Sequence, residues 1–430
     1  MIDNKTLIEI NTCPQAKNKT EELYIIKRRI KAFGNSLCFY LCRIFPIKRN
    51  LVSVCTFEGK GGFGCNPKYI VMELHNQDSN LEFVWFVNKD IIDKKEFPDY
   101  IRKVPNTLWS RAYWLSRSMV WIDNYRKPLG TVKRRKQLYI NSWHGMCGFK
   151  SIGLWRGKSF SKMAYLVSKN DSKMVDYFLS DSDFTDEFFI KGLVYRGEFL
   201  KTGSPRCDTL VNKRDMLKEK FYKKQGFNLE DKCIMFAPTY REVEDNGKRS
   251  VHSQLWSIDF DAMLKALSDK DGCRWHLILR LHPQIATYYK SNMQYIDVTM
   301  EDDMYEILGA MDALVTDYSS CAMDAAIMEI PVFIYADDIE KYKYDRGVFT
   351  WLIDEKSRHD VHINKMTSPN IDAILPFSVA KNNDELREDI EEFDEALYKK
   401  RLNKYEKNIG LIKHGMASKQ VAAKIKEWIK

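Results

Sequence analysis

The sequence predicts an α/β protein with two doubly wound, Rossmann-like lobes and a ligand cleft between them. After Asn50, short apolar runs alternate with longer helical patterns, which is typical of parallel strands joined by crossover helices. The chain has 430 residues, more than one hydrophobic core usually supports, and 44% of them are hydrophobic. In such folds the ligand binds beyond the carboxyl ends of the strands.

Residues 1–49 are expected to form a basic amphipathic helix at a membrane surface. Residues 1–50 hold ten Lys or Arg and four Asp or Glu, and so carry +6 of the net charge of +9. Their apolar stretch, within residues 24–45, is about half the roughly 20 residues that a bilayer span requires. Basic residues flank this stretch, which favours lying on an anionic leaflet over crossing it. An ordinary helix packed on the protein's own core is the alternative.

The expected compartment is the cytoplasm. The N-terminus is polar and lacks an apolar core near a cleavage site, so no secretory signal is expected. The ten cysteines include no CxxC pair, which argues against a zinc site or a disulfide framework and favours a reducing environment. With the basic N-terminal segment, this predicts a peripheral protein at the cytoplasmic face of the cell membrane.

The first lobe is expected to span residues 50–203 and the second 204–381, and helices over 382–430 are expected to pack back on both. The strands are the short apolar runs bounded by polar residues. Expected strands are Leu51–Phe57, Leu81–Val87, Met119–Ile122, Leu138–Trp143, Cys233–Ala237, His276–Arg280, Ala313–Thr316 and Pro331–Tyr335. Expected helices are Asn66–His75, Lys173–Leu179, Asp259–Ser268, Met304–Ala310 and Ser320–Met328.

Ser319 and Ser320 lie between the strand-like run 313–316 and the helical pattern that follows it. The hydroxyls of Ser319 and Ser320, with the first free N–H groups of the helix, would suit a phosphate or diphosphate. The alternative is that one of the serines only caps its helix.

Two histidines also follow strand-like runs. His144 comes after the run 138–141, and the glycines that follow it let a ligand approach the backbone, so it could accept a proton from an attacking hydroxyl. Arg280 and His282 end another run and would bind a diphosphate or stabilise a leaving group. The alternatives are a structural histidine and a polar turn stopped by Pro283.

Taken together and in this order, these segments resemble the CDP-glycerol glycerophosphotransferase family of teichoic acid and related capsule synthesis. The resemblance rests on WHG at 143–145, GxPRxD at 203–208, APTxR at 237–241, RLHP at 280–283 and TDYSS at 316–320, which Asp324 follows. It covers residues from about 50 to about 390. A departure is Met146-Cys147, where many relatives have Thr-Pro.

The resemblance implies a glycosyltransferase-B fold at the membrane surface that uses CDP-glycerol, releases CMP and needs no metal or other cofactor. The acceptor it implies is a teichoic acid or capsular glycan, lipid-linked. By motif, His144 would be the base and His282 the partner of the diphosphate. The implied substrate-binding residues are Trp143, Gly145, Arg206, Pro238, Thr239, Arg280, Ser319, Ser320 and Asp324.

Three alternatives stay open: transfer of ribitol phosphate from CDP-ribitol, transfer of a sugar from another nucleotide donor, and a non-catalytic membrane-surface scaffold with the same fold. The basic stretch 126–136 is expected either to meet a polyanionic acceptor or lipid headgroups, or to be a solvated loop. Nucleic acid is not expected as a partner, because aromatic residues are not interleaved with these cations as stacking platforms.

Overall fold

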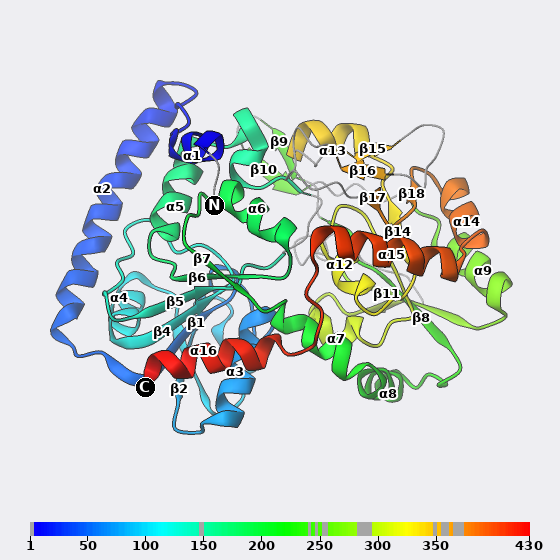
Figure 1. Ribbon diagram of the computed structural model, residues 1–430, viewed down its shortest axis with the longest axis horizontal. Helices are drawn as coiled ribbons and strands as arrows, with labels where there is room; N and C mark the ends of the chain where they lie inside the picture. The colour runs from blue at the N-terminus through cyan, green and yellow to red at the C-terminus, as the bar shows by residue number, and fades with distance from the viewer. Residues whose placement is uncertain are drawn as a thin grey trace. The chain divides into compact units, whose positions relative to one another are not determined.

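The structure is a computed structural model that describes residues 4–145, 150–239, 242–245, 248–251, 257–281, 295–346, 351–353, 361–363 and 374–430. The chain divides into two compact units, one of residues 1–146, 152–208 and 412–430, the other of residues 147–151 and 209–411. Each unit contains a parallel sheet with helices around it (Figure 1). The predicted α/β class is confirmed.

The first unit is built on a seven-stranded sheet in the order β3-β2-β1-β4-β5-β6-β7, with all neighbours parallel. The central strands β4 and β5 are buried along their whole length, as expected of a sheet covered on both faces. The strands are β1 (Lys48–Cys55), β2 (Glu82–Val87), β3 (Ile101–Pro105), β4 (Ser118–Asp123), β5 (Leu138–Asn141), β6 (Tyr177–Ser180) and β7 (Glu198–Lys201).

The helices of the first unit include the last helix of the chain, α16. Several begin at a residue whose side chain accepts a main-chain N–H three residues on, as Ser161 does for α5 and Ser182 for α6. The helices are α1 (Asn4–Asn11), α2 (Lys19–Leu41), α3 (Cys65–Gln77), α4 (Leu108–Arg117), α5 (Lys162–Ser172), α6 (Asp183–Gly192) and α16 (Ala417–Ile429).

Helix α2 packs on α4 at the edge of this unit (Figure 1). Its buried side chains, Ile25, Ala32 and Phe39, are spaced seven residues apart and so lie on one face. Gly130 fits against that face with φ +89°, and a Cβ there would lie 2.3 Å from the carbonyl oxygen of Ala32. The close approach therefore requires glycine.

The second unit has a six-stranded parallel sheet in the order β12-β11-β8-β13-β14-β18. Its strands are β8 (Lys232–Phe236), β11 (Trp275–Leu279), β12 (Ile296–Asp297), β13 (Ala313–Thr316), β14 (Val332–Tyr335) and β18 (Val379–Ala380). Short antiparallel strands are β9 (Glu242–Asp245), β10 (Lys248–Val251), β15 (Trp351–Ile353), β16 (Val361–Ile363) and β17 (Ile374–Leu375). Helices are α7 (Asp208–Asn212), α8 (Arg214–Gln225), α9 (Phe260–Asp271), α11 (Met304–Leu308), α12 (Cys321–Ala326), α13 (Ile339–Arg346), α14 (Asn383–Glu391) and α15 (Glu395–Ile409).

All eight expected strands are found, with ends shifted by up to a few residues. The helix expected at Lys173–Leu179 is wrong. The carbonyl of Asp171 accepts the N–H groups of Met174 and Val175, which closes α5, and the aromatic run that follows forms strand β6 instead. Helix α12 is also shorter than the expected Ser320–Met328.

The units divide the chain differently from the expected boundary at residue 203. Residues 204–208 group with the first unit, so Arg206 belongs there, and residues 412–430 return to it, whereas α14 and α15 stay with the second. Among the helices that the structure describes, none is both long enough and apolar enough to cross a membrane.

Candidate active site

His144 lies in the turn that follows β5, and the loop after β4 holds its ring. The Nδ1 atom lies 2.7 Å from the main-chain carbonyl oxygen of Asn124. A carbonyl oxygen can only accept a hydrogen bond, so in the neutral imidazole Nδ1 carries the proton and Nε2 is the acceptor. The arrangement suits a general base that works through Nε2.

Aromatic rings enclose the imidazole. Its ring centroid lies 4.6 Å from that of Trp143 and 5.5 Å from those of Tyr125 and Phe57. Trp143 also stacks on Tyr125 at 5.7 Å. These rings restrict the rotation of His144 and exclude water from one side of it, and both effects favour a fixed base.

Backbone strain is concentrated around His144. Six non-glycine residues in the described part of the chain have a positive φ, and four of them, Phe57, Glu58, Cys65 and Trp143, lie in the loops around this histidine or beside the residues that hold its turn. Each such conformation costs on the order of 1–3 kcal/mol and persists only where the surroundings hold it. Clustered strain of this kind is typical of functional sites.

Asn66 and Arg206 hold the same turn from another side. The Asn66 amide donates to the carbonyls of Ser142 (3.3 Å) and Trp143 (3.4 Å), and its oxygen accepts the N–H of Arg206 (3.0 Å). The Arg206 guanidinium is 1% exposed and donates to the carbonyl of His144 at 2.7 Å. The WHG and GxPRxD motifs are therefore brought together, with Arg206 supporting the turn of His144.

Asn66 has no assigned role in the sequence-based prediction. The signal that would have found it is weak, since an asparagine at the start of a helix usually caps it. Instead it lies within the first turn of α3, is fully buried, and joins two loops.

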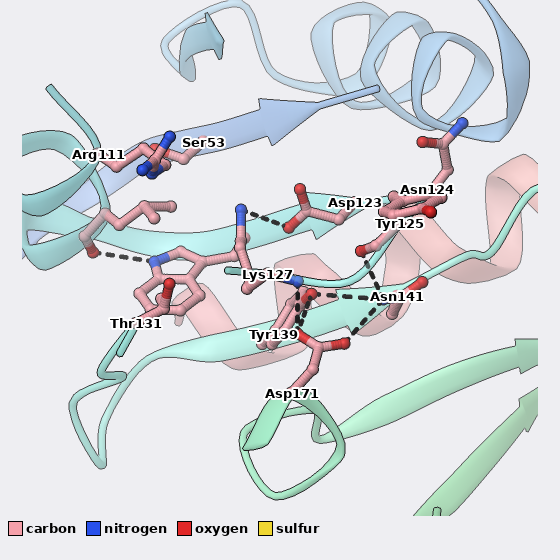
Figure 2. A network of polar contacts seen from close by, with 12 residues as sticks. Ser53, Arg111, Asp123, Asn124, Tyr125, Lys127, Thr131, Tyr139, Asn141 and Asp171 are labelled. Carbon is pink, nitrogen blue, oxygen red and sulfur yellow. Dashed lines mark hydrogen bonds and ion pairs between the residues drawn. The ribbon is translucent and has the colours of Figure 1, made fainter. Parts of the chain in front are cut away.

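A buried polar network lies behind the turn (Figure 2). Asp171 accepts hydrogen bonds from the Tyr139 hydroxyl (3.0 Å) and from the main-chain N–H of Lys127 (2.9 Å). The Lys127 ammonium pairs with Asp123 at 2.6 Å, with both side chains at most 5% exposed. Burial raises the pKa of Asp171 to about 7 and also raises the pKa of Asp123.

In the second unit, Asp317 ties the loop after β8 to the end of β13. Its carboxylate accepts the main-chain N–H of Thr239 (2.8 Å), the Thr239 hydroxyl (3.0 Å) and the N–H of Tyr318 (2.6 Å). Pro238 and Thr239, predicted to bind substrate, are thus held at the carboxyl edge of the sheet. Asp317 itself was not among the predicted residues, although it is the acidic residue of the TDYSS motif.

Arg280 follows β11 at the same edge. Its guanidinium donates to the carbonyl of Val298. Burial lowers the pKa of Arg280, and the carboxylates of Asp303, Glu301, Asp302 and Asp297 oppose that shift. The arginine stays charged at neutral pH, as anion binding requires.

Ser319 and Ser320 are half-buried and precede α12. The Ser319 hydroxyl accepts the N–H of Cys321 at 3.4 Å, whereas the Ser320 side chain makes no capping hydrogen bond. Asp324 is 6% exposed and accepts the Tyr305 hydroxyl at 2.6 Å, a contact that packs α12 on α11. The substrate-binding roles of these three residues stay predictions.

Two predicted elements cannot be placed. His282 lies outside the described residues, as do Tyr240 and Arg241 of the APTxR segment. Trp143, His144, Gly145 and Arg206 belong to the first unit and the other predicted residues to the second. The common pocket expected for them stays a prediction.

Much of the basic stretch 126–136 serves the fold. Besides the buried Lys127, Lys133 pairs with Asp176 at 2.8 Å and Arg134 donates to the carbonyl of Phe45 at 2.9 Å, just after α2. Arg135 and Lys136 are exposed. Contact of the whole stretch with a polyanion is therefore not supported. No cluster of three or more His, Cys, Asp or Glu in the described ranges could hold a metal ion.

Two α/β units with parallel sheets, with histidine, arginine and serine side chains at strand ends, fit a class of protein: group-transfer enzymes of the glycosyltransferase-B type. The family model for CDP-glycerol:poly(glycerophosphate) glycerophosphotransferase matches residues 37–356. The chain belongs to this family, and the predicted resemblance is confirmed.

Similar proteins act in teichoic acid synthesis. The teichoic acid poly(glycerol phosphate) polymerase of Bacillus spizizenii is 29% identical over 72% of this chain and 79% of its own length. The teichoic acid glycerol-phosphate transferase of Staphylococcus aureus is 30% identical over 68% and 76%. A poly(ribitol-phosphate) polymerase of Bacillus spizizenii is 25% identical over 80% of this chain and 53% of its own length.

A solved structure of the wall teichoic acid polymerase TagF has the same fold. It matches with a TM-score of 0.74 and 22% identity, over 100% of this chain and 99% of that one. The predicted glycosyltransferase-B-like class is thereby confirmed.

Proposed function

We propose that this protein transfers glycerol phosphate from CDP-glycerol to a hydroxyl group of a teichoic acid or related cell-envelope polymer. Family membership supports the reaction class. The observation that carries the proposal is the hydrogen bond from His144 Nδ1 to the Asn124 carbonyl, because it orients Nε2 as a base.

In the proposed reaction the acceptor oxygen attacks the phosphorus atom that bears glycerol. The new oxygen–phosphorus bond forms as the bond to the CMP oxygen breaks, and His144 Nε2 takes the acceptor's proton. CMP leaves with the electron pair of the broken bond. Arg280, His282, Ser319 and Ser320 are proposed to stabilise its charge, since phosphoryl transfer depends mainly on positioning and electrostatics.

The test is CMP release from CDP-glycerol by the purified protein with membrane extract, followed by identification of the glycan product. His144→Gln removes the base but keeps a polar side chain of similar size, and is expected to lower kcat by roughly 10²–10⁴-fold without changing the thermal midpoint. A variant with wild-type kcat would remove His144 from the mechanism.

Transfer of ribitol phosphate is the second candidate, because a ribitol-phosphate polymerase is among the similar proteins. Parallel assays with CDP-ribitol compare kcat/KM for the two donors, and a higher value for CDP-ribitol would replace the first proposal. Absence of binding of either donor in calorimetry would favour a non-catalytic scaffold.

We also propose that α2 attaches the protein to an anionic membrane. Opposite its packed face, α2 and the turn after it expose Ile26, Ile30, Phe33, Leu37 and Ile44, each more than half exposed. On α2 the spacing of three or four residues puts Ile26, Ile30, Phe33 and Leu37 in one row, and Ile44 follows in the turn after the helix.

Cations border this row. Lys27, Arg29 and Lys31 are all exposed on the same helix. An apolar row with flanking cations matches an anionic bilayer surface, where the row enters the acyl boundary and the cations meet the headgroups. A helix of 23 residues, about 34 Å long, would lie in the plane of the surface.

The test is sedimentation with vesicles of phosphatidylglycerol and phosphatidylcholine. Phe33→Glu with Ile30→Glu should abolish sedimentation, whereas Leu229→Glu, which alters an equally exposed side chain elsewhere, should not. Unchanged sedimentation of the double variant would refute the proposal. If the wild type instead dimerises in analytical ultracentrifugation and ignores vesicles, the row is an interface between copies.

A further inference from the structure

Asn141 links the two loops that hold His144. It is the last residue of β5 and is fully buried. Its side-chain oxygen accepts the main-chain N–H of Trp143 at 2.9 Å, and its amide nitrogen donates to the main-chain carbonyl of Tyr125 at 3.0 Å. One side chain thus connects the turn that carries His144 to the loop that supplies its Nδ1 acceptor, Asn124.

The distance between the loops after β4 and β5 determines whether the His144 ring keeps its hydrogen bond to Asn124. The bond from Nδ1 to the Asn124 carbonyl is 2.7 Å long, and a hydrogen bond of this kind weakens steeply when its atoms move apart. Trp143, directly before the histidine, has φ +48°, a conformation that relaxes when its hydrogen bonds are lost. Without the bridge, we expect both loops to relax and the imidazole to lose its fixed tautomer.

Asp171 lies beside the NH₂ group of Asn141. Its Oδ2 atom lies 3.5 Å from the Asn141 nitrogen, and Oδ1 is occupied by the Tyr139 hydroxyl and the Lys127 N–H (Figure 2). When ionised, Asp171 only accepts, so its Oδ2 atom then faces the NH₂ group of Asn141. The Trp143 N–H and the Tyr125 carbonyl require the same amide orientation. Asp171 is fully buried at the end of α5, which holds it in place.

We propose that Asn141 is a positioning residue for His144, supported by the neighbouring Asp171. The inference rests on the proposed function, because it assigns these residues to the base of that reaction. Neither side chain is exposed, so neither is expected to touch substrate. Their effect is on the tautomer and placement of the imidazole, and hence on kcat rather than on donor binding.

The test uses Asn141→Asp, Asp171→Asn and the double variant in the full chain. Asn141→Asp keeps an acceptor for Trp143 but loses the donor to Tyr125 and faces Asp171 with a second carboxyl group. We expect kcat to fall at least about 10-fold with KM for CDP-glycerol within about twofold. The double variant exchanges the two groups, so that the amide now at position 171 can donate to the carboxylate now at position 141. This removes the repulsion between two carboxyl groups but does not restore the donor to Tyr125, so kcat should recover only in part, by about threefold over Asn141→Asp.

Asp176→Asn is the matched control. Asp176 also holds β5, through the N–H of Tyr139 at 2.7 Å, but no hydrogen bond connects it to Asn141 or Trp143 in the described ranges. Asp176→Asn should change the thermal midpoint about as much as Asn141→Asp does, but it should leave kcat within about twofold of the wild-type value. If Asn141→Asp does not fold, Asn141→Ser, which is too short to bridge both loops, takes its place.

A second readout does not depend on activity. Nitrogen-15 shifts of the His144 ring, assigned by comparison with His144→Gln, should show Nε2 as the unprotonated nitrogen in the wild type and a mixture of tautomers in Asn141→Asp. If the wild type releases CMP from neither donor, the proposed function fails and the shifts still test the positioning. Wild-type kcat or wild-type ring shifts in Asn141→Asp, or no recovery in the double variant, would overturn the inference.

Discussion

Replacing Asp171 by asparagine should change how stability depends on pH. Asp171 is fully buried and its pKa is raised to about 7 from an ordinary value of 3.8, with burial as the main cause. The folded protein therefore keeps a proton on Asp171 between these values, where the unfolded chain releases it. Raising the pH through this window removes stability, because the unfolded state binds fewer protons.

The size of the stability change follows from the difference between the pKa values of Asp171 in the folded and unfolded states. Each pKa unit corresponds to about 1.36 kcal/mol, so ionising Asp171 in the folded state costs about 4 kcal/mol in total. Three donors partly compensate the ionised form, since Tyr139, Lys127 N–H and Asn141 all point at the carboxylate. As the pH rises, the free energy of unfolding falls by at most about 1.4 kcal/mol per pH unit. The fall stops near pH 7, where Asp171 ionises in the folded state as well.

The assay is urea denaturation of the wild type and Asp171→Asn at pH 5, 6, 7 and 8. Between pH 5 and 7 the free energy of unfolding of the wild type should fall relative to that of the variant by about 2–3 kcal/mol, and the difference should level off above pH 7. Asp176→Asn should keep the wild-type slope. Parallel curves for the wild type and Asp171→Asn would refute the raised pKa and the reading of Asp171 as a buried acid.

Three further changes have defined outcomes. Arg206→Lys keeps the charge but loses the planar fork that reaches the His144 carbonyl; urea denaturation should show a loss of about 1–3 kcal/mol, and CMP release should fall with it. Asp317→Asn turns an acceptor of three hydrogen bonds partly into a donor, and should raise KM for the donor substrate more than it lowers kcat, as steady-state kinetics would show. Gly153→Ala puts a Cβ 1.6 Å from the Gly192 carbonyl oxygen and should cost clearly more in urea denaturation than Gly157→Ala. Gly157 has a similar φ and open space but a ψ of −129°, and its replacement should cost about 1–3 kcal/mol.

The central strands were predictable because their burial is continuous. Strands such as β4 and β13 are buried throughout, with an apolar run that ends in a polar residue. Among the strands that the sequence did not reveal, β3 and β7 are edge strands with exposed residues in the middle or at both ends. Strands β12 and β18 are two-residue edge strands of the second sheet, and β6 starts soon after α5. An edge strand buries too little to leave a readable apolar run.

Strand-end position was enough to single out His144 and Arg280, but not the residues that hold them. Asn141 lies within a strand and Asp171 within a helix, where a lone polar residue is usually a solvated one. Trp143 adopts a φ of +48°, which sequence reasoning reserves for glycine or asparagine. Their roles arise from tertiary contacts between β4, β5 and α5, and no local pattern encodes these contacts.

The acceptor at Nδ1 of His144 is a main-chain carbonyl and not a carboxylate, and this choice fits the proposed chemistry. A carboxylate would stabilise the imidazolium and raise the basicity of Nε2, whereas a carbonyl mainly fixes the tautomer. Transfer of a phosphate group depends mainly on positioning and electrostatics, so a well-placed base without a carboxylate partner is sufficient for the proposed reaction. In the proposed reaction, the buried Asn141, Asp171, Asn66 and Arg206 act through the geometry of one turn.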